Sequence, residues 1–293
     1  MTYVEQEIAS QPACWTRAVE VAGARADALP RRGERIAVVG CGTSWFMAQS
    51  YAVLRESAGH GETDAFAASE FPIGRGYDRV LAITRSGTTT EVLELLGQLP
   101  SSIPSVAIIG DPTSPGVALA GDAIVLDFAD EKSVVQTRFA TTTLALLRAS
   151  LGEDLAGAIS DAAKAVEVGL PVDVATIEQI TFLGRGWTVG LANEAGLKCR
   201  EAATFWTESY PAMEYRHGPI SIAAPNRAVW AFGEVPNGLA EDVARTGAAF
   251  VASDMDPLAD LVVAQRVAVA LAAHRGLDPD QPRHLTRSVI LDG

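Results

Sequence analysis

A strand–glycine–helix unit occurs twice in this chain and restricts the folds open to it. The segments IAVVGCGTSWFMA and ITFLGRGWTVGLA begin at Ile36 and Ile180, 144 residues apart. Each has a short apolar, β-prone run, a G-x-G turn and a helix-forming segment, which is the repeating unit of a doubly wound parallel sheet. Further strands are predicted at 80–83, 105–109 and 123–126. We therefore expect an α/β fold with two parallel sheets, each covered by helices on both faces.

The turn that follows residues 80–83 is rich in hydroxyl groups. Its sequence, TRSGTTT, contains Thr84, Ser86, Thr88, Thr89 and Thr90, with Arg85 among them. Amides at a helix N-terminus, together with hydroxyls and a guanidinium, suit a phosphate monoester. The alternative is a capping box formed by Thr88 and Glu91, but a cap uses only one or two hydroxyls. The turn therefore favours phosphate binding.

A group of charged residues lies in the second half of the chain. Residues 193–203 contain no Pro and one Gly, which predicts a helix. Three charged residues share one face of it: Glu194, Lys198 and Glu201. After the turn-like segment 207–212 come Glu214 and His217. These residue types can perform general acid–base catalysis. The alternative is a solvated helix face with an ion pair, which is the commoner case for charge spacing alone.

Composition narrows the partners and the cofactors. The formal net charge of −13 argues against nucleic acid or an anionic membrane as the main partner. Three dispersed cysteines and four histidines form no metal-ligand pattern, and the G-x-G turns lack the third glycine of a dinucleotide motif. No uninterrupted apolar run reaches the length of a membrane span, and the N-terminus has no signal-peptide pattern. We expect a cytoplasmic protein with reduced thiols and no cofactor.

Eight motifs in order carry a resemblance to a known family. They are EIASQP, GCGTS, ASEF, ITRSGTTTE, SVVQTR, EAGLKCRE, ESYPAMEYRHGP and DPDQPRHLTRSV. Together they resemble the double SIS (sugar isomerase) domain proteins, close to the isomerase half of glucosamine-6-phosphate synthase and to the amino-sugar-6-phosphate deaminases. The resemblance implies two tandem flavodoxin-like domains. We expect a helical arm at 1–32, domains at 33–155 and 156–280, and a tail at 281–293.

The resemblance also assigns roles to individual positions. Residues that match phosphate- or sugar-binding positions of the family are Thr43, Ser44, Thr84, Ser86, Thr89 and the backbone of Val134. Glu201 matches the base that moves a proton between C1 and C2, with Lys198 and Glu194 as its helix neighbours. His217 matches the imidazole of ring opening, which in the family comes from the adjacent subunit. The resemblance therefore implies a homodimer with shared active sites.

The chain departs from the synthase in four respects. We expect no glutaminase domain or nucleophilic cysteine ahead of the first domain. Arg287 stands where the synthase has a lysine that forms a Schiff base, and arginine stays protonated. Gln136 replaces a sugar-binding serine, and Arg85 replaces a glutamine of the phosphate turn. These residues, with Thr88 and Glu194, complete the predicted substrate-binding set. The departures favour a free-standing deaminase, because an amino sugar already carries its nitrogen.

Three functions remain open from the sequence. The first is a deaminase–isomerase that converts an amino-sugar 6-phosphate, such as glucosamine 6-phosphate, to fructose 6-phosphate and ammonia. The second is a deglycase that splits fructosamine-type 6-phosphates. The third is a catalytically silent phosphosugar sensor, which would need the phosphate turn but not Glu201 or His217.

Overall fold

The computed structural model describes residues 1–291, which form two compact units. The β1–β5 unit comprises residues 13–131, 136–155 and 286–291. The β6–β9 unit comprises the remaining described residues, 1–12, 132–135 and 156–285. Each unit therefore combines segments that are far apart in the sequence, whereas the sequence predicted an arm, two successive domains and a tail.

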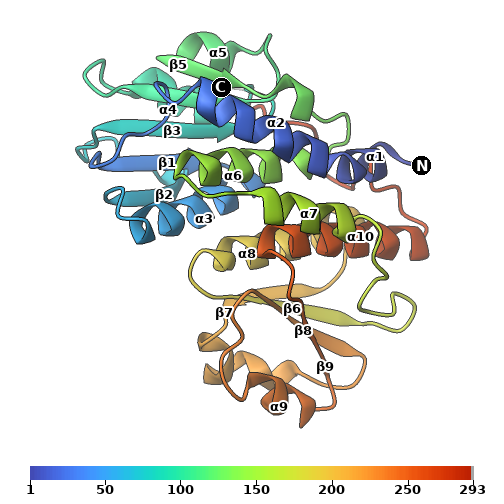
Figure 1. The fold of residues 1–293 in the computed structure, drawn as a ribbon. Coiled ribbons are helices and arrows are strands. Elements are labelled where there is room, and N and C mark those ends of the chain that lie inside the picture. Colours follow the sequence, from blue (N-terminus) through green and yellow to red (C-terminus); the bar gives the residue numbers. More distant parts are fainter. Residues whose placement is uncertain (292–293) are drawn as a thin grey trace. The chain divides into compact units, whose positions relative to one another are not determined.

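The β1–β5 unit is built on a five-stranded parallel sheet with the order β2-β1-β3-β4-β5 (Figure 1). Its strands are β1 (Ile36–Gly40), β2 (Thr63–Ala67), β3 (Arg79–Thr84), β4 (Ser105–Ile109) and β5 (Asp122–Val125). Its helices are α2 (Gln11–Ala24), α3 (Thr43–Ser57), α4 (Thr90–Gln98), α5 (Pro115–Leu119) and α6 (Arg138–Ser150), with 3-10 helices η1 (Ala68–Glu70) and η2 (Asp127–Ala129). This strand order is that of flavodoxin-like folds.

Burial on both faces explains why these strands have continuous apolar sequences. Val39 and Ala82 pack in one core cluster with Val92 and Leu95 of α4. Val38, whose side chain points the opposite way along β1, is fully buried as well. Parallel strands covered on both faces lack the polar alternation of a half-exposed sheet.

The β6–β9 unit repeats this plan with four parallel strands in the order β7-β6-β8-β9 (Figure 1). Its strands are β6 (Gln179–Gly184), β7 (Thr207–Pro211), β8 (Arg227–Phe232) and β9 (Ala249–Ala252). Its helices are α1 (Tyr3–Ala9), α7 (Ala156–Ala165), α8 (Thr188–Ala203), α9 (Leu239–Ala244) and α10 (Pro257–His274), with η3 (Glu214–His217) and η4 (Pro219–Ile222). The two repeated sequences thus form β1 with α3 and β6 with α8, as predicted.

The prediction of a turn at residues 207–212 was wrong. Residues Thr207–Pro211 form β7, which pairs in parallel with β6. Pro211 is tolerated because β7 is an edge strand and the proline ends it. β7 also packs closely against α8, since a Cβ on Gly196 of α8 would lie 2.5 Å from the Ser209 hydroxyl of β7. The absence of a side chain at Gly196 lets the strand approach the helix.

Helix α10 is long and apolar enough to span a membrane by length and composition alone. However, 72% of that window is buried within the protein. A buried core helix passes the same test, and α10 packs against α7, α8 and β8. Its sequence is also interrupted by polar residues, including Asp260, whose side chain is buried.

Asp260 accepts a hydrogen bond from the Trp230 indole N–H at 2.9 Å in the core of the β6–β9 unit. Burial raises the pKa of Asp260 from 3.8 to about 6, although the Trp230 hydrogen bond opposes that shift. The folded protein therefore binds a proton more tightly than the unfolded chain. This carboxyl consequently lowers stability as the pH rises from 3.8 to about 6.

Asp260→Asn is expected to stabilise the protein above pH 6 by up to about 3 kcal/mol, because it removes a buried charge but keeps an acceptor for Trp230. Urea unfolding between pH 4 and pH 8 would measure this. The gain should shrink at the acid end, where the wild-type carboxyl is protonated. Trp230→Phe should raise the pKa of Asp260 further, because it removes the hydrogen bond that lowers it, and the loss of stability should then extend to higher pH. If the wild type and Asp260→Asn lost equal stability as the pH rises, the Asp260 carboxyl would not be the group responsible.

Candidate active site

The hydroxyl-rich turn and the first G-x-G turn line one small pocket of the β1–β5 unit, about 30 Å³ in volume. Both turns follow the carboxyl ends of neighbouring strands, β1 and β3. The lining residues are Cys41, Ser44, Ile83, Thr84, Arg85, Ser86, Thr89, Val92, Gln136 and Arg287. This site is the position at which doubly wound sheets bind ligands. Seven of the predicted substrate-binding residues are therefore brought together.

The backbone of the turn explains its glycine. Gly87 has φ +61°, and a Cβ there would lie 2.0 Å from the Ser114 hydroxyl, so only glycine fits. The Thr84 hydroxyl accepts from the Gly87 amide at 3.3 Å, and the Ser86 hydroxyl accepts from the Thr88 amide at 3.2 Å. Each accepting hydroxyl keeps its own proton for a ligand.

The capping-box alternative for this turn was wrong. The N-cap of α4 is Thr89, and its side chain makes no capping hydrogen bond. The Thr88 hydroxyl instead bonds to the Ser288 hydroxyl at 2.9 Å. No hydroxyl of the turn therefore caps α4, although its Thr90 amide bonds to the Val289 carbonyl, and the positive end of the helix dipole lies beside the pocket.

Thr43 and Ser44 open α3, and both are buried. The chain reaches them through Gly42, whose φ of +53° favours glycine. A Cβ on Gly40 would lie 2.7 Å from Ser44, so the strand end and the helix start pack in contact. Ser44 lines the pocket, whereas Thr43 lies beside it in sequence but is not among the lining residues.

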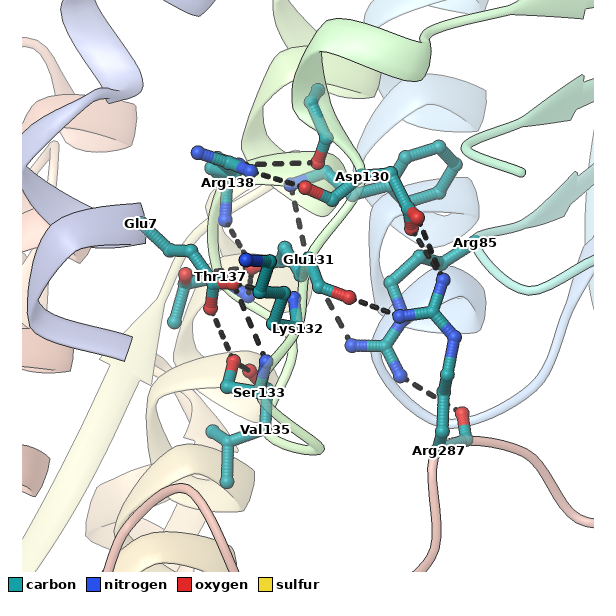
Figure 2. Close-up of polar contacts among 12 residues, drawn as sticks. Glu7, Arg85, Asp130, Glu131, Lys132, Ser133, Val135, Thr137, Arg138 and Arg287 are labelled. Atoms are coloured by element: carbon teal, nitrogen blue, oxygen red, sulfur yellow. Dashed lines mark hydrogen bonds and ion pairs between the residues drawn. The ribbon is translucent and has the colours of Figure 1, made fainter. Parts of the chain in front are cut away.

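Arg85 is buried among polar groups rather than exposed to solvent. Its Nη1 lies 3.9 Å from the Glu131 carboxylate, and its Nη2 donates to the Arg287 carbonyl at 2.8 Å (Figure 2). Glu131 is itself fully buried and accepts from the Thr137 amide, the Thr137 hydroxyl and the Arg138 amide at 2.6, 2.8 and 2.9 Å. Glu131 thus caps α6 and neutralises Arg85. Gln136, in the same loop, has a buried Oε1 with no partner among the described residues.

The C-terminal tail is attached to this pocket. The Arg287 Nη2 donates to both carboxylate oxygens of Asp130, at 2.7 and 2.8 Å, and its Nη1 donates to the Glu131 carbonyl (Figure 2). The Thr90 amide donates to the Val289 carbonyl at 3.1 Å. Arg287 is therefore held by a carboxylate and a carbonyl at the pocket wall.

The charged face of α8 is buried, so the solvated-face alternative was wrong. The side chains of Glu194 and Lys198 are 0% and 1% exposed, and their charged atoms lie 3.4 Å apart. Lys198 also forms a short ion pair with Glu201, whose side chain is 19% exposed. A buried ammonium between two carboxylates costs desolvation energy that a surface ion pair does not. Such an arrangement is typical of functional sites, and Glu201 is its solvent-accessible member.

Two other predicted residues of this unit belong to segments outside α8. His217 is exposed at the end of η3, and no hydrogen bond or ion pair described for residues 1–291 links it to the α8 charges. Val134 belongs to the loop 132–135, which Glu7 of α1 holds by accepting from the Lys132 and Ser133 amides at 2.6 and 3.3 Å (Figure 2).

Sequence reasoning missed the acidic residues that support these groups. Glu7 lies within the motif EIASQP, and Asp130 and Glu131 lie within the acidic segment DFADEKS. Their spacing gives no sign of the distant partners that they bind. Within residues 1–291, no group of three or more His, Cys, Asp or Glu residues is placed to hold a metal ion.

Curated proteins that resemble the chain in sequence are sugar-phosphate enzymes. No family model matches the chain. The glutamine–fructose-6-phosphate aminotransferases (isomerizing) of Sulfurisphaera tokodaii and Xanthomonas campestris are each 26% identical to it, over 89% and 99% of this chain. The chain spans only 51% and 59% of the lengths of these relatives, so their whole activity does not transfer with the match.

Solved structures resemble the chain over nearly its whole length. Glucosamine-6-phosphate deaminase from Thermotoga maritima has a TM-score of 0.85 at 22% identity and covers 99% of this chain and 100% of its own. The chain has the fold of the phosphosugar isomerases. The C-terminal domain of the Francisella tularensis glucosamine-fructose-6-phosphate aminotransferase has a TM-score of 0.82 at 21% identity, covering 96% and 98% of the two chains. The tagatose-6-phosphate ketose/aldose isomerase of Escherichia coli scores 0.81 at 18% identity, covering 99% and 96%.

Proposed function

We propose that the chain is a double SIS domain enzyme, an amino-sugar-6-phosphate deaminase–isomerase. Glucosamine 6-phosphate would be converted to fructose 6-phosphate and ammonia. The observation that carries the proposal is the buried Glu194–Lys198–Glu201 group, because a sensor has no use for it. A protein that only bound phosphosugars would need the hydroxyl-lined pocket alone.

The proposed role of the pocket is to bind the 6-phosphate. The hydroxyls of Ser44, Thr84, Ser86 and Thr89 line it, and the N-terminus of α4 adds the positive end of the helix dipole. Arg85 contributes positive charge while Glu131 and the Arg287 carbonyl fix its position. These groups would orient the substrate without taking part in proton transfer.

The proposed chemistry follows from the groups on α8. With the ring open, Glu201 removes the proton from C2 and returns it to C1, while a proton from the amino nitrogen passes to O1, so the 2-amino aldose becomes a 2-imino product with a C1 hydroxyl. Water then adds to the C=N bond, and ammonia leaves, so glucosamine 6-phosphate and water yield fructose 6-phosphate and ammonia. Lys198 would stabilise negative charge that develops on oxygen.

Two further features complete the proposal. His217 would assist ring opening, since an imidazole exchanges protons near neutral pH. As the family resemblance implies, it would serve a neighbouring copy in a cytoplasmic homodimer. Arg287 supports a substrate that already carries its nitrogen, because a guanidinium that is held by Asp130 cannot form an imine with a ketose.

Incubation of the purified protein with glucosamine 6-phosphate should release ammonia and fructose 6-phosphate in equal amounts. Unphosphorylated glucosamine is the matched control and should not turn over, because it lacks the group that the pocket binds. No ammonia together with retained sugar-phosphate binding would indicate the sensor. Turnover of fructosamine 6-phosphates alone would indicate the deglycase.

A further inference from the structure

The β6–β9 unit has a pocket of its own at the carboxyl ends of its strands. This pocket has a volume of about 250 Å³ and is formed by the segments that follow β6, β7 and β8. Its lining residues are Arg185, Met213, Arg216, Glu234, Val235, Pro236 and Asn237. β6 is the strand from which the chain leads first to β7 on one side and then to β8 on the other (Figure 1). Ligands of doubly wound sheets bind where the strand order reverses in this way.

Strand register relates this pocket to the hydroxyl-lined pocket of the β1–β5 unit. Val39 pairs with Ala82 in one sheet, and Leu183 pairs with Ala231 in the other. Counting on from these pairs places Arg185 at the position of Cys41, and Glu234 at the position of Arg85. The two pockets are therefore formed by corresponding turns of the repeated fold, with different chemistry.

The second pocket has lost the features that suit a phosphate. Val235 and Pro236 occupy the positions of Ser86 and Gly87 by the same count. Thr188 occupies the position of Ser44, but its hydroxyl is already engaged with the Arg185 amide at 2.8 Å and the Phe232 carbonyl at 2.9 Å. These differences argue against a phosphate as the ligand of this pocket.

Opposite charges face each other at the mouth of this pocket. Arg185 and Glu234 form an ion pair whose side chains are 49% and 71% exposed. Exposed pairs contribute only about 0–1 kcal/mol, so a ligand can separate them at little cost. A second guanidinium, that of Arg216, is held by Asp242 and by the Asn237 carbonyl at 2.9 Å. Met213, half of whose surface is exposed, provides an apolar wall.

We propose that this pocket binds a free α-amino acid. The ligand carboxylate would pair with Arg185, and its ammonium group with Glu234, so both members of the ion pair keep a partner. A guanidinium matches a carboxylate with two parallel hydrogen bonds. The side chain of the ligand would pack on Met213, Val235 and Pro236. This site is separate from the phosphate pocket and does not depend on the proposed sugar chemistry.

Titrations of the full chain with L-alanine, L-leucine and L-glutamate, followed by amide chemical shifts, test the proposal. At least one of the three is expected to saturate in the millimolar range and to shift the backbone amides of residues 185, 234, 235 and 237. Propionate, which is L-alanine without its ammonium group, should bind at least about tenfold more weakly, because it leaves Glu234 without a ligand cation. No saturation by any of the three amino acids, or equal binding of propionate and L-alanine, would overturn the proposal.

Three variants locate the site. Arg185→Ala is expected to weaken the binding of amino acids by about tenfold or more, whereas Arg283→Ala, an exposed arginine outside this pocket in the same unit, should not. Glu234→Gln should remove the preference for L-alanine over propionate. Glucosamine 6-phosphate binding should be unchanged in Arg185→Ala, so failure of the sugar chemistry and failure of this site are separate results. Unaltered amino-acid binding in Arg185→Ala would place the ligand elsewhere and refute the assignment.

Discussion

Glu201→Gln is expected to lower ammonia release from glucosamine 6-phosphate by about two to four orders of magnitude, because general acid–base catalysis contributes about that much. Glutamine keeps the size of the side chain but cannot accept the C2 proton. Glu201 is also the one member of its buried charged group with a partly exposed side chain. Coupled assays of ammonia and fructose 6-phosphate would measure the loss.

Two controls separate loss of the base from loss of the fold. Exchange of the C2 hydrogen with deuterated solvent should disappear in Glu201→Gln, whereas sugar-phosphate binding should remain. Glu241→Gln changes an exposed glutamate of the same unit and should leave turnover unchanged. Undiminished ammonia release by Glu201→Gln would rule out its role as the base.

Glu131→Ala is expected to destabilise the protein by about 3–5 kcal/mol, because it leaves the buried Arg85 guanidinium without its carboxylate. The same change removes the acceptor for the Thr137 and Arg138 amides at the start of α6. Urea unfolding at neutral pH would measure the loss. Glucosamine 6-phosphate affinity should fall as well, since Arg85 and Gln136 line the pocket.

Glu131→Gln is the matched variant for this second prediction. Its amide oxygen can still accept from Thr137, so the cap of α6 should survive while the opposite charge is lost. We expect a smaller loss of stability than in Glu131→Ala, and part of that loss should be recovered when Arg85→Gln is added. Equal stability of the wild type and Glu131→Ala would show that Glu131 does not compensate Arg85.

Local sequence was a good guide to the buried strands and a poor one to the edge of the sheet. The predicted strand 105–109 matches β4, and the prediction for residues 80–83 differs from β3 by one residue at each end. These strands are apolar throughout because both of their faces are covered. β7 was missed because an edge strand needs no continuous apolar run, and its sequence TESYP contains a proline.

In the candidate site, too, some groups could be predicted from the sequence and others could not. Hydroxyls within one turn, or charges spaced along one helix, could be grouped from the sequence because the backbone brings them together. The partners of Arg85 could not, since Glu131 lies 46 residues away and Arg287 lies 202 residues away. Contacts of that kind depend on the tertiary fold, which is also why the burial of Glu194 and Lys198 could not be predicted from their spacing.

The division of the chain into units has a consequence for synthesis on the ribosome. The β1–β5 sheet and its helices are complete once residue 155 has emerged, but residues 286–291 belong to the same unit. Domains generally fold as units, beginning with the N-terminal one. Here the first sheet must remain without Arg287 at its pocket while more than a hundred further residues are translated. The hydroxyl-lined pocket therefore acquires its final wall only after the second sheet has been made.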